Sequence, residues 1–227
     1  MGKPVAPRQL VLALDHAESF ARDDFLAGPP NAAALSLIDR WPDWPAQTMA
    51  LVGPEGSGKS HLAAIWSDIA GARQLSGRLL GEADLPAAFA TGALVVDDLA
   101  PEGLDERALF HLLNLAREEG AYVLFTMQTP PAAFPVAIRD LGSRLRAIPT
   151  VTLAPPDDAL LRALMVKLAA DRQIELDEPL VNFLANRIER SFSAVHAAIK
   201  QLDLEAMRQH RPVTRALAAT LWRDSPI

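Results

Sequence analysis

One segment has the residue types and spacing of a phosphate-binding loop. It reads Gly53, Pro54, Glu55, Gly56, Ser57, Gly58, Lys59 and Ser60. Glycines let the backbone curl so that its N–H groups point at phosphate oxygens. The lysine brings a positive charge to the outer phosphates, and the final serine offers a hydroxyl to Mg²⁺. The pattern is that of a P-loop and predicts binding of ADP or ATP. The alternative is a glycine-rich turn that holds no ligand.

An acidic pair, Asp97 and Asp98, follows the next apolar run along the chain. A carboxylate at the carboxyl end of a strand can hold the water shell of Mg²⁺. We therefore expect Asp97 to serve the metal ion from a strand that neighbours the P-loop strand. Asp98 either polarises an attacking water or caps a turn.

Three other features have a chemical and a structural interpretation. Gln128, after a further apolar run, either contacts a γ-phosphate or caps a loop. Arg144, in the segment 140–146, by itself favours a surface ion pair. His61, beside Ser60, is more often a packing residue, and we expect no metal site there.

The first eighteen residues contain alternating leucines after a glutamine. Side chains two residues apart share one face of an extended strand. The segment is therefore either an edge strand of its own domain or a peptide that adds to a partner. The residues in question are Gln9, Leu10, Leu12 and Leu14.

The elements that would position these residues alternate between strand and helix patterns. Short apolar runs at 48–52, 93–96 and 121–126 predict buried strands, and 151–153 continues the strand character. Apolar spacing predicts helices at 31–40, 60–70 and 105–119. Such alternation indicates an α/β layer with a mostly parallel sheet. After a Pro-Pro-Asp-Asp segment the pattern is helical to the end, at 157–172, 178–189, 193–209 and 214–222. We therefore expect an arm at 1–18, an α/β domain at 19–153 and a small all-helical lid domain at 154–227.

Composition excludes several classes of protein. The 227 residues are 50% hydrophobic and 22% charged, which is typical of a globular protein. No cysteine is present, which excludes disulfides, thiolate zinc sites and cysteine nucleophiles. The net charge of -6 argues against nucleic acid as the default partner. No apolar stretch reaches the ~20 residues that span a bilayer, so we expect a cytoplasmic protein.

The order of these features resembles the AAA+ module of DnaA-type replication initiators, over roughly residues 18–210. The resemblance includes 24–31 before the P-loop, 58–62 within it, 110–114 after the acidic pair, Pro130 with Pro131, and 140–145. It implies that Phe25, Leu26 and the P-loop motif through His61 surround the nucleotide. It also implies that Arg144 is an arginine finger acting on the nucleotide of an adjacent AAA+ subunit.

Within that family the chain looks most like the Hda-type regulators of the initiator. We expect no helix-turn-helix domain, because the chain ends soon after the helical region. The segment containing Gln9 resembles the motif by which such regulators dock on the β sliding clamp. The resemblance implies a clamp-bound negative regulator of replication initiation that triggers ATP hydrolysis in the initiator. The acidic balance and the absent helix-turn-helix predict no sequence-specific DNA binding, and the lack of a long apolar stretch predicts no membrane contact. Homo-oligomers stay open.

Two departures from the family concern nucleotide sensing. The lid position of the family's sensor II arginine falls on Ser193 or Ala194, with Arg190 a turn away. The apolar run 121–126 is followed by Met127, Gln128 and Thr129 rather than by an acidic residue and an arginine. We therefore expect at most a weak intrinsic ATPase. The alternatives are a stand-alone ATPase of the helicase-loader kind and a DNA-binding adaptor of the initiator.

Overall fold

The structure has two parts, and a five-stranded parallel sheet forms the centre of the larger one. The structure, a computed structural model, describes residues 20–222. The strand order is β2-β3-β4-β1-β5, and every described pairing is parallel. The strands are β1 (Thr48–Val52), β2 (Arg73–Ser76), β3 (Ala93–Asp97), β4 (Tyr122–Met127) and β5 (Thr150–Thr152). The predicted α/β fold class is therefore confirmed.

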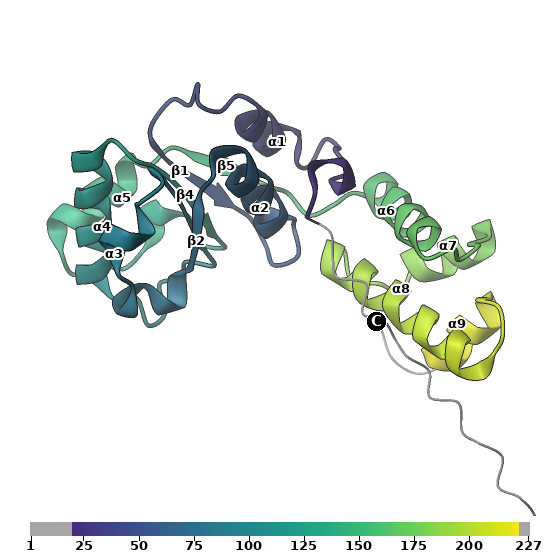
Figure 1. Ribbon diagram of the computed structural model, residues 1–227. Coiled ribbons are helices and arrows are strands. Elements are labelled where there is room, and N and C mark those ends of the chain that lie inside the picture. The colour runs from purple at the N-terminus through teal and green to yellow at the C-terminus, as the bar shows by residue number, and fades with distance from the viewer. Residues whose placement is uncertain (1–19, 223–227) are drawn as a thin grey trace, which may run out of the picture.

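Helices cover both faces of this sheet (Figure 1). One face packs against α1 (Ala32–Asp39) and α2 (Lys59–Ala70), and the other against α3 (Leu85–Ala88), α4 (Glu106–Glu119) and α5 (Arg139–Ala147). Alternate residues of β1, β3 and β4 belong to the two clusters: in β1, Met49 and Leu51 are in the first, and Ala50 and Val52 in the second. Successive side chains of a strand point to opposite faces of the sheet. Because helices cover both faces here, most positions of the central strands are buried, which explains the continuous apolar runs in the sequence. Short 3-10 helices lie at η1 (Arg22–Asp24), η2 (Gly77–Glu82) and η3 (Pro131–Ala133).

The last four helices form a separate bundle beside the sheet layer, which we call the lid (Figure 1). They are α6 (Asp158–Asp171), α7 (Glu178–Ala185), α8 (Phe192–Gln209) and α9 (Arg215–Leu221). Their apolar faces make a third cluster centred on Met165, Leu184 and Ile199. Side chains of Asp157, Asp177, Ser191 and Thr214 accept the N-terminal N–H groups, as helix caps do. We refer to residues 20–153 as the base.

The structure corrects the sequence-based expectation in several places. The acidic pair does not lie on the strand next to β1, because β4 separates β3 from β1. Strand β2 was missed because it is partly exposed and contains no apolar run. Helix α5 was also missed. Helix α7 ends at Ala185 rather than at 189, although the apolar spacing continues to the buried Ile188.

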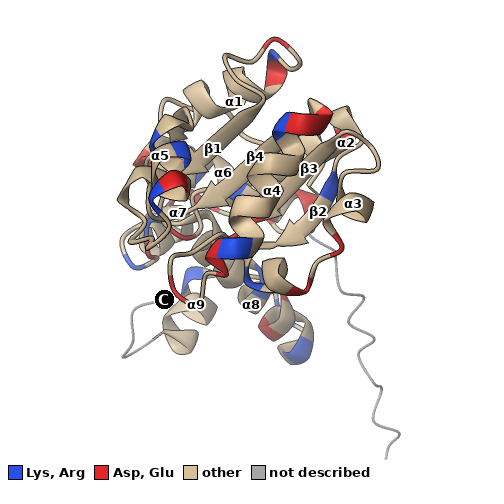
Figure 2. Cartoon of the chain, turned by 90° about the vertical axis from the view of Figure 1, so that its left-hand side faces the viewer, with Lys and Arg blue, Asp and Glu red and all other residues tan. Residues whose placement is uncertain are grey.

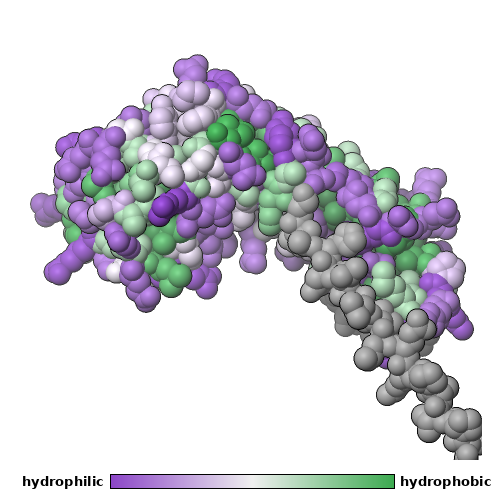
Figure 3. Space-filling model, in the orientation of Figure 1, coloured by the Kyte–Doolittle hydropathy of each residue, from purple (hydrophilic) through white to green (hydrophobic). Residues whose placement is uncertain are grey.

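Seen from the side drawn in Figure 2, basic and acidic residues are interspersed along the elements of the chain. The face drawn in Figure 3 is mostly hydrophilic over the base, with apolar residues scattered among polar ones. Among residues 20–222, no helix is both long and apolar enough to cross a membrane.

Candidate nucleotide site

The glycine-rich loop connects β1 to α2, as a P-loop does. Gly58 is the N-cap of α2 in a left-handed conformation (φ 92°), and Gly56 at the tip is also left-handed (φ 66°). Residues with a Cβ adopt such angles at a cost of roughly 1–2 kcal/mol. A Cβ at Gly56 would also lie 2.4 Å from Ser193 Oγ of the lid. The loop conformation and its contact with α8 therefore both require glycine at this position.

Lys59 places a buried cation inside this loop. Its side chain is largely buried, and its Nζ donates to the carbonyl oxygens of Gly53 (2.9 Å) and Pro54 (2.7 Å). Burial lowers the pKa of the Lys59 ammonium, and the nearby carboxylates of Asp98, Asp97 and Glu55 oppose that shift only in part. A desolvated cation gains from an anionic partner. The loop is thus electrostatically suited to a phosphate group.

Ser60 and Asp97 supply the oxygen ligands expected at a magnesium site. Ser60 Oγ donates to Asp97 Oδ1 at 3.1 Å, although the two residues come from α2 and from the end of β3. Hydroxyl and carboxylate oxygens are hard ligands of the kind that Mg²⁺ prefers. These two residues therefore fit a magnesium ion that also contacts bound phosphates.

Asp98 has an unusual backbone. Its φ is 53°, which is left-handed and uncommon for a residue other than glycine. Its N–H donates to Thr126 Oγ1 at 2.9 Å, and its Oδ2 accepts from Arg78 at 3.1 Å on the exposed side of the strand end. The side chain is 46% exposed and remains accessible to water.

A cavity of about 660 Å³ extends from the P-loop along the seam between base and lid. Phe25, Leu26 and His61, which the resemblance placed near a nucleotide, line this cavity. The rings of Phe20 and Phe25 both meet the His61 ring edge-on, with centroids 5.3 and 5.2 Å apart. The P-loop end therefore offers backbone N–H groups and a cation, and the neighbouring wall offers aromatic surface.

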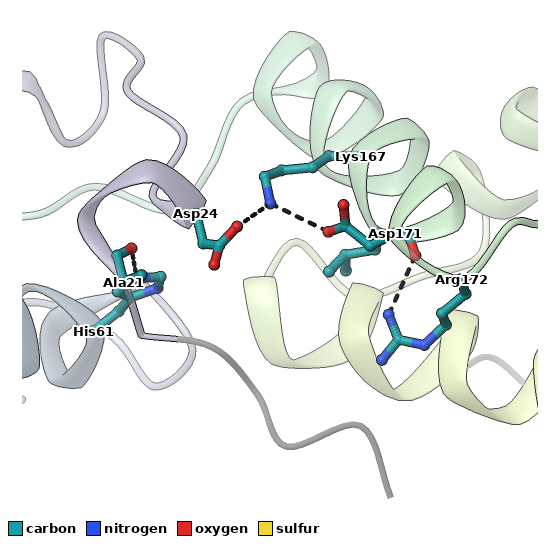
Figure 4. A network of polar contacts seen from close by, with 7 residues as sticks. Ala21, Asp24, His61, Lys167, Asp171 and Arg172 are labelled. Atoms are coloured by element: carbon teal, nitrogen blue, oxygen red, sulfur yellow. Dashed lines mark hydrogen bonds and ion pairs between the residues drawn. The ribbon is translucent and has the colours of Figure 1, made fainter. Parts of the chain in front are cut away.

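The lid wall of this cavity is rich in charged side chains that the sequence did not single out. Figure 4 shows Lys167 of α6 between Asp24 of η1 and Asp171 of its own helix. Lys167 Nζ donates to Asp24 Oδ1 at 2.5 Å and to Asp171 Oδ2 at 3.1 Å. Other lid residues of this kind on the wall are Arg172, His196 and Lys200. Only the tertiary fold could identify them, because each lies in an ordinary helical pattern.

The start of α8 contacts the P-loop directly. Phe192 N–H donates to the Gly56 carbonyl oxygen at 2.8 Å. Ser193, which lines the cavity, and Ala194 lie in this first turn, at the positions where the family carries an arginine. Arg190 is instead paired with Asp158 at 2.9 Å, with its side chain 64% exposed, and does not line the cavity. The possibility that Arg190 replaces the missing arginine is therefore not supported.

Some predicted residues lie away from this cavity. Gln128 is exposed and does not line it. Arg144 of α5 lines a separate cavity of about 290 Å³, and its guanidinium lies 4.8 Å from the centre of the Phe110 ring and 3.6 Å from Asp140. Gln9, Leu10, Leu12 and Leu14 lie outside the described residues.

Comparison with solved structures identifies the fold. The chain superimposes on domain III of the Thermotoga maritima initiator DnaA with a TM-score of 0.74 at 20% identity, covering 92% of this chain and 98% of that domain. A replication initiator DnaA bound to AMPPCP and single-stranded DNA matches with a TM-score of 0.69 at 16% identity, over 86% of this chain and 69% of that one. The fold is that of the DnaA-type AAA+ module.

Sequence comparisons refine this placement. The chain is 24% identical to the initiator DnaA of Thermomicrobium roseum over 89% of this chain and 49% of the relative. It is 30% identical to that of a Caulobacter strain, K31, over 83% of this chain and 45% of the relative. The chain thus spans about half the length of these relatives. Residues 157–218 match the family model described as the lid domain of Hda. The chain is thus similar in sequence to DnaA initiators over most of its length, and its lid matches the family model of the Hda lid domain.

Proposed function

We propose that this protein is a nucleotide-bound regulator of a DnaA-type initiator, and that it stimulates ATP hydrolysis in that partner through Arg144. The observation that carries the proposal is the placement of Arg144. Its side chain is 26% exposed and lines none of the nucleotide cavity of its own chain. An arginine so placed is available to a nucleotide held by another subunit.

The neighbours of Arg144 favour this role. Stacking on Phe110 restricts the guanidinium without neutralising it. The ion pair with Asp140 is long, and the Asp140 side chain is exposed. A phosphate group could therefore easily replace Asp140 as the partner of the guanidinium. Glu106 of α4 accepts the N–H groups of Ala137 and Ile138, which anchors the start of the helix carrying Arg144. A rigid, preorganised guanidinium can stabilise charge that develops on a transferring γ-phosphoryl group.

The protein's own nucleotide would be ADP or ATP, bound by the P-loop from Gly53 to Ser60 with Phe25, Leu26 and His61 along the adjoining wall. Magnesium, when bound through Ser60 and Asp97, would neutralise phosphate charge. In this proposal the nucleotide joins base and lid, and the hydrolysis that matters takes place in the partner. The segment with Gln9 and Leu12 would tether the protein to the β sliding clamp, a proposal that comes from the sequence alone.

The proposal is tested by ATP turnover of the purified initiator with clamp-loaded DNA and the regulator. Arg144→Ala should reduce stimulation to the basal rate of the initiator, because arginine fingers contribute about a thousandfold or more where they have been measured. Arg139→Ala, an exposed arginine of the same helix, is the matched control and should stimulate normally. Full stimulation by Arg144→Ala would show that the mechanism is wrong.

An ATPase acting on its own is the second candidate, favoured by the contact of Ser60 with Asp97 and by the accessible carboxylate of Asp98. Steady turnover of ATP by the isolated protein, abolished by Asp98→Asn, would support it. Absence of turnover together with tight nucleotide binding would favour the regulator.

A further inference from the structure

Thr126 is a buried polar residue at the end of the strand that separates the acidic pair from the P-loop. It is 1% exposed, and its neighbours along β4, Phe125 and Met127, are fully buried. In the sheet register Thr126 pairs with Leu51 of β1, while Phe125 pairs with Val96 of β3. The residue therefore lies between the strand that leads into the P-loop and the strand that ends in Asp97.

The hydroxyl of Thr126 both donates and accepts a hydrogen bond with the acidic pair. Its Oγ1 donates to Asp97 Oδ1, and the same oxygen accepts the N–H of Asp98 at 2.9 Å. Its backbone carbonyl accepts the N–H of Leu99, also at 2.9 Å. One residue of β4 thus fixes the side chain of the first acidic residue and the backbone of the second.

The carboxylate oxygen that Thr126 contacts also accepts a hydrogen bond from Ser60. Asp97 Oδ1 accepts from Ser60 Oγ as well as from Thr126 Oγ1. The left-handed backbone of Asp98 is held by the Thr126 bond at the point where the strand ends. Removal of the hydroxyl would free the Asp97 carboxylate to rotate and would leave the Asp98 N–H without this acceptor.

We propose that Thr126 is the positioning residue of the magnesium site, holding Asp97 toward Ser60 and Asp98 in its left-handed conformation. It acts through these two residues and does not touch the ion. The β4-end residue favoured by the sequence, Gln128, is exposed and lines none of the cavity. The inference rests on the proposed binding of a magnesium nucleotide. Partners of this outer kind typically change metal affinity by about 10- to 100-fold.

The test is the magnesium dependence of ADP affinity, measured by calorimetry at a series of Mg²⁺ concentrations and in EDTA. Thr126→Val keeps the shape of the side chain but removes the hydroxyl. It should raise the Mg²⁺ concentration for half-maximal effect by about tenfold or more, with ADP affinity in EDTA unchanged. Thr126→Ser, which keeps the hydroxyl, should behave as wild type. A purely structural role would lower affinity equally with and without Mg²⁺.

Each other outcome overturns a defined part of the argument. Wild-type magnesium dependence in Thr126→Val would overturn the positioning role, as would equal loss in Thr126→Ser. Tight ADP binding by wild type without any magnesium dependence would contradict the proposed magnesium site but support the proposed nucleotide binding. No ADP binding by wild type would overturn the nucleotide-binding proposal itself. If Thr126→Val does not fold, Thr126→Ala leaves room for a water at the Asp98 N–H and is subject to the same criteria.

Discussion

At the scale of single residues, Gly56 links the phosphate loop to the lid. Its backbone is left-handed, and its carbonyl accepts the N–H of Phe192. A methyl group there would meet Ser193 Oγ at 2.4 Å and Ser191 Cβ at 2.8 Å. The first turn of α8 could remain in place only if the loop tip moved.

Gly56→Ala should therefore weaken ADP binding by about tenfold or more, since backbone strain of roughly 1–2 kcal/mol is added to the clash. Calorimetric titration with ADP measures the change. Gly71→Ala is a matched control, because Gly71 is also left-handed (φ 63°) and a Cβ there meets nothing within 4 Å. Equal affinities of the two variants would show that the contact between Gly56 and α8 does not matter for binding.

Candidate site residues that are close together in the sequence could be predicted. Those brought together only by the order of the strands and the packing of the helices could not. The P-loop is continuous in sequence, so its glycines, Lys59 and Ser60 can be recognised from the motif alone. Thr126 and Lys167 carry no local signal, because their partners lie 29 and 143 residues away. Gln128 was the candidate at the end of this strand, and Thr126 was not considered, because the sequence shows a strand end but not which side chain turns toward the neighbouring strand.

At the scale of elements, one ion pair joins η1 of the base to α6 of the lid across the cavity wall. Lys167 and Asp24 are 23% and 33% exposed, so water screens their interaction only in part. The hydrogen bond that Lys167 donates to Asp24 is the main reason that the pKa of Lys167 is raised. A raised lysine pKa stabilises the fold fully below the unfolded pKa near 10.4. The contribution is lost as pH rises through the folded pKa, so this link between base and lid should weaken as the solution becomes strongly alkaline.

Asp24→Asn should accelerate ADP release by about fivefold, since partly exposed charged pairs contribute up to roughly 1 kcal/mol. Stopped-flow displacement of a fluorescent ADP analogue measures the rate. Asp171→Asn is the control, because it removes the second partner of Lys167 within α6 and leaves the link to the base. The exchanged pair Asp24→Lys with Lys167→Asp should restore slow release. Equal rates in Asp24→Asn and Asp171→Asn would argue against a link across the seam.

The elements found from the sequence are those with strong apolar periodicity. Strands β1, β3 and β4 and most helices lie within two residues of their expected bounds, because burial fixes their pattern. Strand β2 pairs only at the edge of the sheet and exposes Arg73 and Gln74, so nothing in its sequence resembles a buried strand. Helix α5 buries only Leu141, Gly142 and Leu145 of its nine residues, which explains why its pattern was missed.

At the scale of the whole molecule, base and lid have separate apolar cores. Two clusters cover the faces of the sheet, and the third lies among α6, α7, α8 and α9. The seam between them contains the P-loop contact with α8, the Asp24–Lys167 pair and the 660 Å³ cavity. A ligand in that cavity would touch both parts, so its binding energy would stabilise their joint arrangement.

Bound nucleotide should therefore raise the thermal stability of the whole chain. At an ADP concentration 100 times the Kd, binding to the folded state contributes about 2.7 kcal/mol. For a chain of this size that corresponds to a rise in Tm of about 5–10 °C, measurable by scanning calorimetry with Mg²⁺ present. Lys59→Met retains the aliphatic stem but removes the buried cation, and its Tm should not respond to ADP. An unchanged wild-type Tm at millimolar ADP would contradict a nucleotide site at the seam, whereas a rise confined to the lid would show that the ligand binds there without joining the two cores.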